Sequence, residues 1–327
     1  MSNVTYRKNE DLKVIKEGWR GNRVEKGRFI NLEAHVKHGV GSVLKWRLSR
    51  NPQWKEKKEE RWDPEIVPLE SIDSIYRNAL VWLGHNSFYM YLGGKRIMFD
   101  PVFGNIPFVK RRSKMPANPD IFQNIDYLLL SHDHYDHMDK KSVKKVCQNS
   151  PELTVICGLG VGELIKQWSP KTRVIECGWY QQVEEQGLKI TFMPCQHWGK
   201  RSASDGGTRL WGAFMVQDSD LSIYYSGDTG YGKHFAEIKH LFGEPHYAML
   251  GIGAYKPRWF MQPNHISPYE ALDASAEMGA QMTIPMHYGT FDLSDEPFSD
   301  PPTVFAKEAE ERDIRINIPK LGEVVYL

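Results

Sequence analysis

Cysteine is scarce in this sequence, with only four residues in 327 and no C-x-x-C pair. The four are Cys147, Cys157, Cys177 and Cys195. Small secreted domains rely on a dense disulfide framework, and this spacing argues against one. We therefore expect free thiols. Cys195 stands two residues before a histidine, but an apolar burial is favoured over metal binding because free cysteines usually pack inside.

Long apolar runs are absent as well. The longest uncharged apolar stretches, such as 127–130 and 248–255, are far shorter than the roughly 20 residues that a membrane helix needs. The opening residues, MSNVTYRKNEDLK, are too polar for a secretory signal. We expect a cytoplasmic protein, with peripheral membrane contact as an option.

Net charge is nearly absent at +1, yet the charge is unevenly distributed. Residues 1–62 carry 16 Lys and Arg against 8 Asp and Glu, a surplus of +8 that leaves −7 for residues 63–327. This stretch also holds four tryptophans, Trp19, Trp46, Trp54 and Trp62. It is too aromatic for a disordered tail. We expect a basic arm over residues 1–75, packed on a catalytic domain at 76–327 or on a second subunit of a homodimer.

The basic face of this arm has two interpretations. It can contact an anionic membrane, or it can be ordinary solvated surface. Nucleic acid is not an expected partner, because the rest of the chain has no basic surplus.

Secondary-structure patterns are clear from residue 79 onward. Strands are predicted at 79–83, 87–92, 95–99, 126–130, 154–157, 173–176, 188–194, 211–216, 222–226, 246–252 and 282–286. Helices are predicted at 140–148, 160–168, 233–242, 268–277 and 303–312. Strands cluster between helices without strict alternation. This favours an α/β sandwich of two mixed β-sheets flanked by helices over a doubly wound parallel sheet.

The decisive segment is IDYLLLSHDHYDHMD, in which an apolar strand runs into the pattern H-x-H-x-D-H. The ligand-type residues are His132, His134, Asp136 and His137. Neutral imidazole and carboxylate are what zinc and similar divalent metals bind. Four such residues within six, directly after a strand, predict a metal site.

Three further ligand-type residues follow apolar strands and precede a glycine closely. They are His197 in FMPCQHWGK, Asp228 in IYYSGDTGY and His287 in TIPMHYGT. Glycine lets the backbone turn sharply beside a metal.

These motifs, in this order, resemble the metallo-β-lactamase superfamily from about residue 85 to 289. The resemblance implies two divalent ions, zinc first, with iron or manganese as alternatives. It implies that His132, His134 and His197 hold one ion, that Asp136, His137 and His287 hold the other, and that Asp228 bridges them. Some true lactamases use a cysteine ligand that this chain lacks, so a β-lactam substrate is not expected.

A narrower resemblance covers residues 80–295. The motifs WLGHNSFYM, FDPVF, SHDHYDHMD, QHWGKR, SGDTGY, IGAYKPRWFM, NHISPYEA and MHYGTF are similar to those of the N-acyl-phosphatidylethanolamine-hydrolysing phospholipases D and their bacterial relatives. The resemblance implies a zinc phosphodiesterase with Tyr135 and His265 lining the metal centre. The chain departs from the animal enzymes at Gly199 and Asn264, and Tyr288 replaces a tryptophan. The shorter N-terminus and these changes leave the natural substrate open.

Four more residues have two interpretations each. Asp100 either accepts a hydrogen bond from a metal-bound imidazole or caps a turn before Pro101. His85 lines the site or is structural. Arg258 either clamps a phosphate or pairs with a carboxylate. Trp259 lines a channel for an acyl chain or lies in the core.

The implied reaction is hydrolysis of a phospholipid-like phosphodiester by a metal-bridging hydroxide. Asp228 or Asp136 would orient the nucleophile, and His265 or Tyr135 would donate to the leaving oxygen. A lactonase or other ester hydrolase is the main alternative. A nuclease and a non-catalytic metal protein are further alternatives, and closed structural sites would favour cysteine ligands.

Overall fold

Two seven-stranded β-sheets form the centre of the molecule in this computed structural model, which describes residues 4–33 and 39–327. The first sheet, in spatial order, contains β10 (Arg173–Cys177), β9 (Thr154–Gly158), β8 (Tyr127–Leu130), β7 (Lys95–Phe99), β6 (Ser87–Leu92), β5 (Ala79–Gly84) and β17 (Val324–Tyr326). The second contains β16 (Met282–Met286), β15 (Tyr247–Gly251), β14 (Ser222–Tyr225), β13 (Ala213–Gln217), β12 (Leu188–Met193), β11 (Gln181–Glu185) and β2 (Lys13–Val14).

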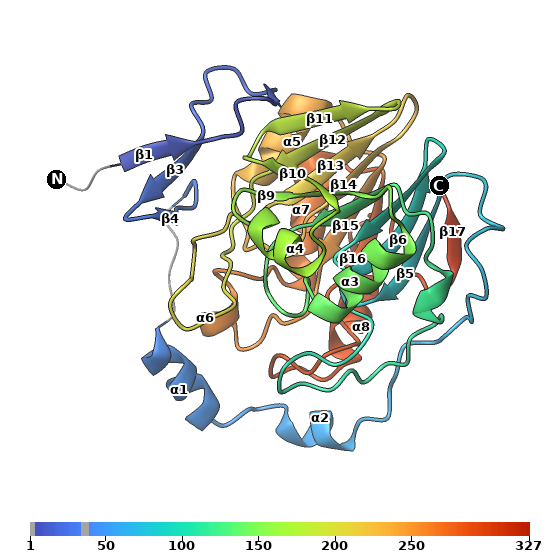
Figure 1. Ribbon diagram of the computed structural model, residues 1–327. Helices are drawn as coiled ribbons and strands as arrows, with labels where there is room; N and C mark the ends of the chain where they lie inside the picture. The colour runs from blue at the N-terminus through green and yellow to red at the C-terminus, as the bar shows by residue number, and fades with distance from the viewer. Residues whose placement is uncertain (1–3, 34–38) are drawn as a thin grey trace.

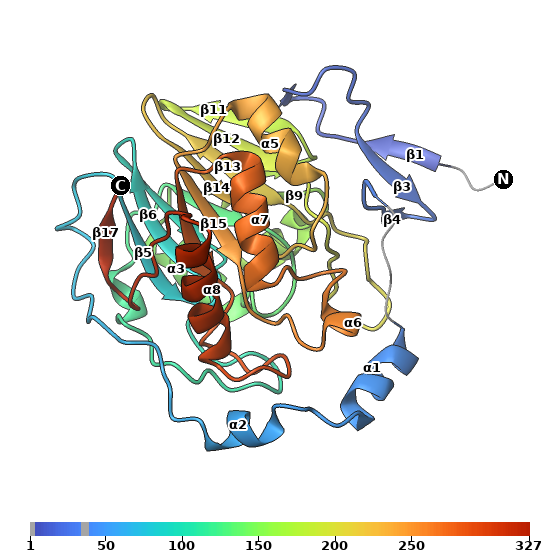
Figure 2. The ribbon, with the colours of Figure 1, turned by 180° about the vertical axis from the view of Figure 1, so that it is seen from behind.

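Helices cover the outer face of each sheet. In Figure 1, α3 (Lys140–Asn149) and α4 (Gly162–Trp168) lie in front of the sheets. From behind, Figure 2 shows α5 (His234–Phe242), α7 (Pro268–Met278) and α8 (Asp300–Glu311) on the opposite side. The predicted sandwich of two mixed sheets flanked by helices is therefore confirmed.

Apolar side chains alternate along the strands and build two cores. In β5, Leu80 and Trp82 belong to the core between the two sheets, whereas Val81 and Leu83 face the core under α3 and α4. Successive side chains of a strand point to opposite faces, so both faces of β5 must be apolar when both are covered.

Residues close together in the sequence form several turns and helix caps. The Gly93-Gly94 pair joins β6 and β7 in an antiparallel hairpin. Ser267 and Glu270 form a capping box at the start of α7. The Asp139 side chain accepts a hydrogen bond from the Ser142 backbone and caps α3. Strands β11 and β17 were not predicted; both are short, and they lie at or next to the edge of a sheet.

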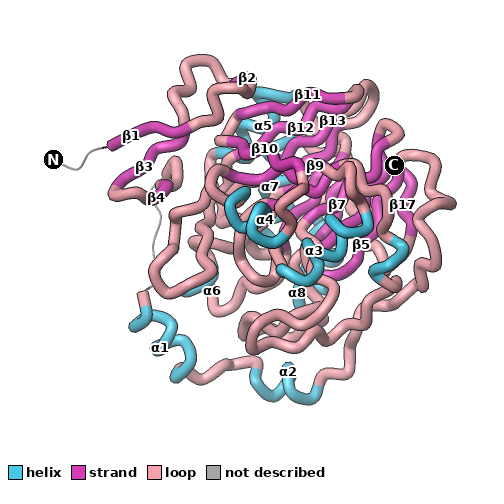
Figure 3. The backbone as a smooth tube through the Cα atoms, in the orientation of Figure 1, coloured by secondary structure: helices cyan, strands magenta, loops and turns pink. Residues whose placement is uncertain are grey.

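The N-terminal segment follows the outside of the sandwich (Figure 3). It contains a small sheet of β1 (Val4–Arg7), β3 (Asn22–Glu25) and β4 (Arg28–Phe29), then α1 (Val40–Leu48) and α2 (Trp54–Glu59). Residues 1–3 and 34–38 of the expected arm lie outside the described residues. Short elements η1 (Pro119–Ile121) and α6 (Arg258–Met261) complete the fold.

Three of the four arm tryptophans contact the domain. Trp19 packs edge-on against Tyr180 with their ring centroids 4.8 Å apart, and the ring centroids of Trp62 and Tyr288 are 6.4 Å apart. Trp46 stacks on Phe260 at 5.0 Å, whereas Trp54 is 58% exposed. Strand β2 also pairs with β11, so part of the arm is an edge strand of the second sheet. The described residues contain no helix that is long and apolar enough to cross a membrane.

Candidate metal centre

The predicted ligands lie beyond the carboxyl ends of strands from both sheets. His132 follows β8, Asp228 follows β14 and His287 follows β16. His197 lies on the loop after β12. Because these strand ends meet at one edge of the sandwich, residues up to 155 positions apart in the sequence share one buried cluster.

One group of ligand-type atoms is formed by three imidazoles and a carboxylate. His132 Nε2 lies 2.9 Å from His134 Nδ1, and His197 Nε2 lies 3.2 Å from the same atom. Asp228 Oδ2 is 3.7 Å from His197 Nε2. Three imidazole nitrogens thus converge on one point beside a carboxylate, which is the donor set of a divalent transition metal.

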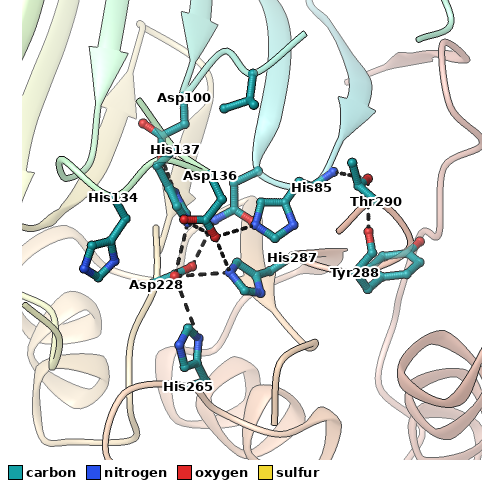
Figure 4. Close-up of polar contacts among 12 residues, drawn as sticks. His85, Asp100, His134, Asp136, His137, Asp228, His265, His287, Tyr288 and Thr290 are labelled. Carbon is teal, nitrogen blue, oxygen red and sulfur yellow. Dashed lines mark hydrogen bonds and ion pairs between the residues drawn. The ribbon is translucent and has the colours of Figure 1, made fainter. Parts of the chain in front are cut away.

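A second group adjoins the first through Asp228 (Figure 4). Asp228 Oδ2 lies 3.1 Å from the Nε2 atoms of both His137 and His287. Asp136 Oδ2 lies 3.8 and 3.7 Å from the same two nitrogens. One oxygen of Asp228 therefore contacts both groups, which is the position that a bridging ligand requires.

Unsatisfied polar atoms show that these residues suit a cation. His137 Nε2 and His287 Nε2 are buried, yet no residue in 4–33 or 39–327 makes a hydrogen bond to either atom. Burial opposes protonation of His287, but Asp228 and Asp136 still raise its pKa to about 9. The two carboxylates thus create a buried region that favours positive charge.

The imidazoles of the first group are held neutral. Burial, followed by the neighbouring His137 and His134, lowers the pKa of His132 well below its usual value. Burial also lowers the pKa of His197. Neutral imidazole is the form that binds a metal.

Asp100 lies behind His137, where its carboxylate collects several hydrogen bonds. Asp100 Oδ2 is 2.8 Å from His137 Nδ1, and it also accepts from the Tyr225 hydroxyl at 2.7 Å. The Ser131 backbone N–H donates to the other oxygen at 2.8 Å. The contact between Asp100 and His137 Nδ1 fixes the His137 ring with its Nε2 directed at Asp228.

His85 lies in the second group and contacts a predicted ligand directly. Its Nε2 is 2.9 Å from Asp136 Oδ2, and its ring centroid is 4.0 Å from that of His287. Thr290 Oγ1 accepts a hydrogen bond from the His85 backbone. His85, Asp100 and His287 all have positive φ values, 52°, 37° and 63°, so the backbone is locally strained where it carries these side chains.

The two residues expected near the leaving group lie in different environments. His265 Nδ1 is 3.8 Å from Asp228 Oδ2, so this ring faces the cluster. The Tyr135 hydroxyl instead donates to the Arg201 carbonyl at 2.9 Å, and its side chain is partly exposed.

Arg258 and Trp259 lie on α6, seven and six residues before His265. The Arg258 guanidinium donates to both carboxylate oxygens of Glu270 at 2.8 and 2.6 Å, and to the His265 carbonyl at 3.1 Å. This is the carboxylate pairing that the sequence left open. Trp259 is 42% exposed, with Lys45 Nζ 4.8 Å from its ring centroid.

Several polar contacts in the centre were not predicted. Asn86 Nδ2 donates to Asp228 Oδ1 at 3.3 Å, and Asn31 of the arm donates to the His197 carbonyl at 2.8 Å. Asn86 directly follows His85, so its place beside a site residue was a usable signal. Nothing in the sequence connects Asn31 with a residue 166 positions away. The four cysteines are free and buried, as expected, and none enters a metal-type cluster of the described residues.

Comparison with known proteins fits this geometry. The model of the β-lactamase superfamily domain matches residues 95–288. This chain belongs to that family. An uncharacterized protein of Mycobacterium tuberculosis is 31% identical over 277 residues, covering 79% of this chain and 72% of that protein.

Two further matches bear on the activity and the fold. The N-acyl-phosphatidylethanolamine-hydrolyzing phospholipase D 1 of Caenorhabditis elegans is 33% identical, covering 65% of this chain and 64% of that protein. The structure of a possible metal-dependent hydrolase from Veillonella parvula matches with a TM-score of 0.63 at 14% identity, covering 77% of this chain and 100% of that one. The chain is thus a metal-dependent hydrolase of the metallo-β-lactamase fold.

Proposed function

We propose that this hydrolase cleaves a P–O bond in phosphodiesters with long apolar groups, of the N-acyl-phosphatidylethanolamine type, at a centre of two divalent metal ions. The observation that carries the proposal is the position of Asp228 Oδ2, which lies 3.1 Å from His287 in the second group, 3.7 Å from His197 in the first group and 3.8 Å from His265. The similarity to a phospholipase D that hydrolyses N-acyl-phosphatidylethanolamine supports the substrate class.

The seven predicted ligands would hold the ions in two sets that share Asp228. Bound ions of this kind lower the pKa of water and neutralise phosphoryl oxygens as charge develops. The Asp228 and Asp136 side chains are ionised. Burial opposes their ionisation, but the neighbouring His137 lowers the pKa of both well below the usual value. They can therefore accept hydrogen bonds from a water that attacks phosphorus.

His265 is the residue that we place beside the leaving oxygen. Burial lowers its pKa to about 4, so the neutral ring carries one N–H at neutral pH. This N–H can donate a hydrogen bond to the leaving oxygen as negative charge develops on it. The Tyr135 hydroxyl already donates to a backbone carbonyl, so it would have to reorient before it could do the same.

An anionic membrane is the proposed surface from which the substrate is taken. Leu44, Leu48 and Trp54 on or near α1 and α2 are 57%, 78% and 58% exposed, and Phe108 is fully exposed. Arg50, Lys55 and Lys110 line one groove together with Trp54 and Phe108. Apolar side chains surrounded by cations suit the interface of an anionic bilayer.

The substrate class is tested with a chain-length series of N-acyl-phosphatidylethanolamines and, in parallel, a series of lactones. We expect kcat/KM to rise with chain length and then level off, because burial contributes about 0.8 kcal/mol per methylene. His265→Ala should lower kcat with its metal content intact, and His240→Ala on the exposed face of α5 should change nothing. Lactone opening without diester cleavage would overturn the phosphodiesterase assignment.

The shared ligand is tested by metal analysis. Asp228→Ala removes a carboxylate oxygen that is in contact with both groups, so we expect loss of both ions and of activity. Elemental analysis that finds two ions per chain in this variant would contradict the bridging role.

Membrane contact is tested by sedimentation with vesicles of phosphatidylcholine and phosphatidylserine. Lys55→Glu with Lys110→Glu should weaken binding, and higher salt should weaken binding of the unmodified protein, because screening acts within about 10 Å at 0.1 M. Lys140→Glu with Lys141→Glu, two exposed positions on α3, makes the same change in charge and is the matched control. Equal binding by both variants would refute the proposed face.

A further inference from the structure

A groove of about 820 Å³ lies between the segment 46–55 and the loop after His287. Its lining includes Trp46, Arg50, Trp54, Phe108 and Lys110. The groove shares residues 292–294 with a small pocket of about 20 Å³. That pocket is lined in part by His85 and His287. The groove therefore lies next to the metal centre, with a single stretch of the loop between them.

The loop is held from outside by the carboxylate of Glu60, whose side chain is only 8% exposed. Glu60 accepts hydrogen bonds from the backbone N–H groups of Phe298 and Ser299, both at 2.8 Å, and from the Ser299 hydroxyl. Helix α8 begins here, and its own N-cap residue makes no side-chain cap. Glu60 thus supplies the negative charge that a helix N-terminus favours.

Helices α1 and α2 contact the same loop at other points. Trp46 Nε1 donates to Asp295 Oδ1 at 3.0 Å, and Asn51 donates to the Asp295 carbonyl at 2.8 Å. Lys57 Nζ lies 2.5 Å from Asp292 Oδ1. The Trp46 ring also stacks on Phe260 of α6, the element that precedes His265. Figure 1 shows α1 and α2 along the lower edge of the sandwich.

We propose that Glu60 is a positioning residue that fixes residues 39–60 against the loop after His287, and that this segment is the outer wall of the substrate groove. The inference rests on the proposed function for its chemistry. The aromatic rings of Trp46, Trp54 and Phe108 suit an apolar chain, and Arg50 and Lys110 suit an anionic group. The groove thus selects anionic amphiphilic substrates by binding the part of the substrate that lies away from the cleaved bond.

Glu60→Gln and its neighbour Glu59→Gln form a matched pair. Both remove one negative charge, but only Glu60 contacts the loop, and Glu59 is exposed. For Glu60→Gln we expect KM for a long-chain N-acyl-phosphatidylethanolamine to rise about tenfold, with kcat and metal content within about twofold of the unmodified enzyme. The KM for bis(p-nitrophenyl) phosphate should not change, because this diester is too short to occupy the groove.

A measurement without substrate accompanies the kinetics. Amide hydrogen exchange at Phe298 and Ser299 should quicken in Glu60→Gln and not in Glu59→Gln, because these N–H groups donate to Glu60. Trp46→Phe keeps an aromatic ring but loses the indole N–H that donates to Asp295, so it should also raise KM, by a smaller factor.

Three results would overturn the inference: equal KM values in the two glutamine variants, unchanged exchange in Glu60→Gln, or loss of metal from that variant. If the unmodified enzyme cleaves no diester, the proposed function fails by itself. In that case the ratio of the KM of Glu60→Gln to the KM of Glu59→Gln is measured with a long-chain N-acyl lactone. The hydrogen-exchange result still applies, because that measurement uses no substrate.

Discussion

Replacing Asp100 by asparagine isolates the support that the metal centre receives from behind. Asp100 Oδ2 contacts His137 Nδ1 at 2.8 Å, the Tyr225 hydroxyl at 2.7 Å and the Ser131 hydroxyl at 2.5 Å. Asparagine has nearly the same shape, and it tolerates the positive φ of 37° at this position. The variant therefore changes the hydrogen bonds without adding strain to the backbone.

The size of the stability loss in Asp100→Asn follows from the number of hydrogen-bond donors around Asp100. An asparagine side chain has one accepting oxygen and one NH₂ group. Either the Ser131 backbone N–H or the three groups that contact Asp100 Oδ2 must therefore face the NH₂ group. Hydrogen bonds to a charged group contribute about 1.5–3 kcal/mol each, so we expect the metal-free protein to lose about 3 kcal/mol of stability. Losing the partner of a metal-binding imidazole weakens metal affinity by about 10–100-fold.

Competition with a zinc chelator measures the affinity, and urea unfolding of the metal-free protein measures the stability. Asp126→Asn is the control, because Asp126 accepts hydrogen bonds from the Arg96 backbone and Lys95 at a half-exposed position away from the centre. A zinc Kd that changes less than about threefold in a folded Asp100→Asn variant would refute the role given to this carboxylate.

Two further predictions concern packing and pH. In Gly199→Ala the added Cβ would clash with Asp133 Oδ1, so we expect urea unfolding to show about 1–3 kcal/mol of destabilisation. Gly206→Ala, with no atom nearer than 3.8 Å, is the control, and an equal loss in both would contradict the steric argument. Burial lowers the pKa of His234 to about 3, so below its usual value near 6.5 the unfolded chain binds a proton that the folded chain does not. The stability that the neutral, buried His234 contributes is complete well above pH 6.5, and it falls by about 2 kcal/mol between pH 7 and pH 5. His234→Gln should therefore lose about 2 kcal/mol less stability than the unmodified protein over this interval. Parallel stability curves for the two proteins would refute this prediction.

The strands and the metal-type residues could be predicted because both depend on neighbours in the sequence. β8 is an apolar run with His132 and His134 directly after it, and the same pattern recurs before Asp228 and His287. Alternation of apolar residues places a strand without any knowledge of its partners. The short elements α1, α2 and β2 gave no such signal, since they bury little apolar surface of their own and depend on the domain that they contact.

The sequence by itself determined the fold class, the chemistry of the candidate metal-binding residues and their order along the chain, because strand periodicity and the H-x-H-x-D-H spacing are local properties. Only the tertiary structure decided which groups support them. In the folded protein Arg258 donates to Glu270, and Asn31 donates to the His197 carbonyl. Glu60 accepts a hydrogen bond from Ser299 at the start of α8. These partners lie 12, 166 and 239 residues apart, respectively. A polar side chain can satisfy its hydrogen bonds with many partners, and folding alone determines which of them lie within reach.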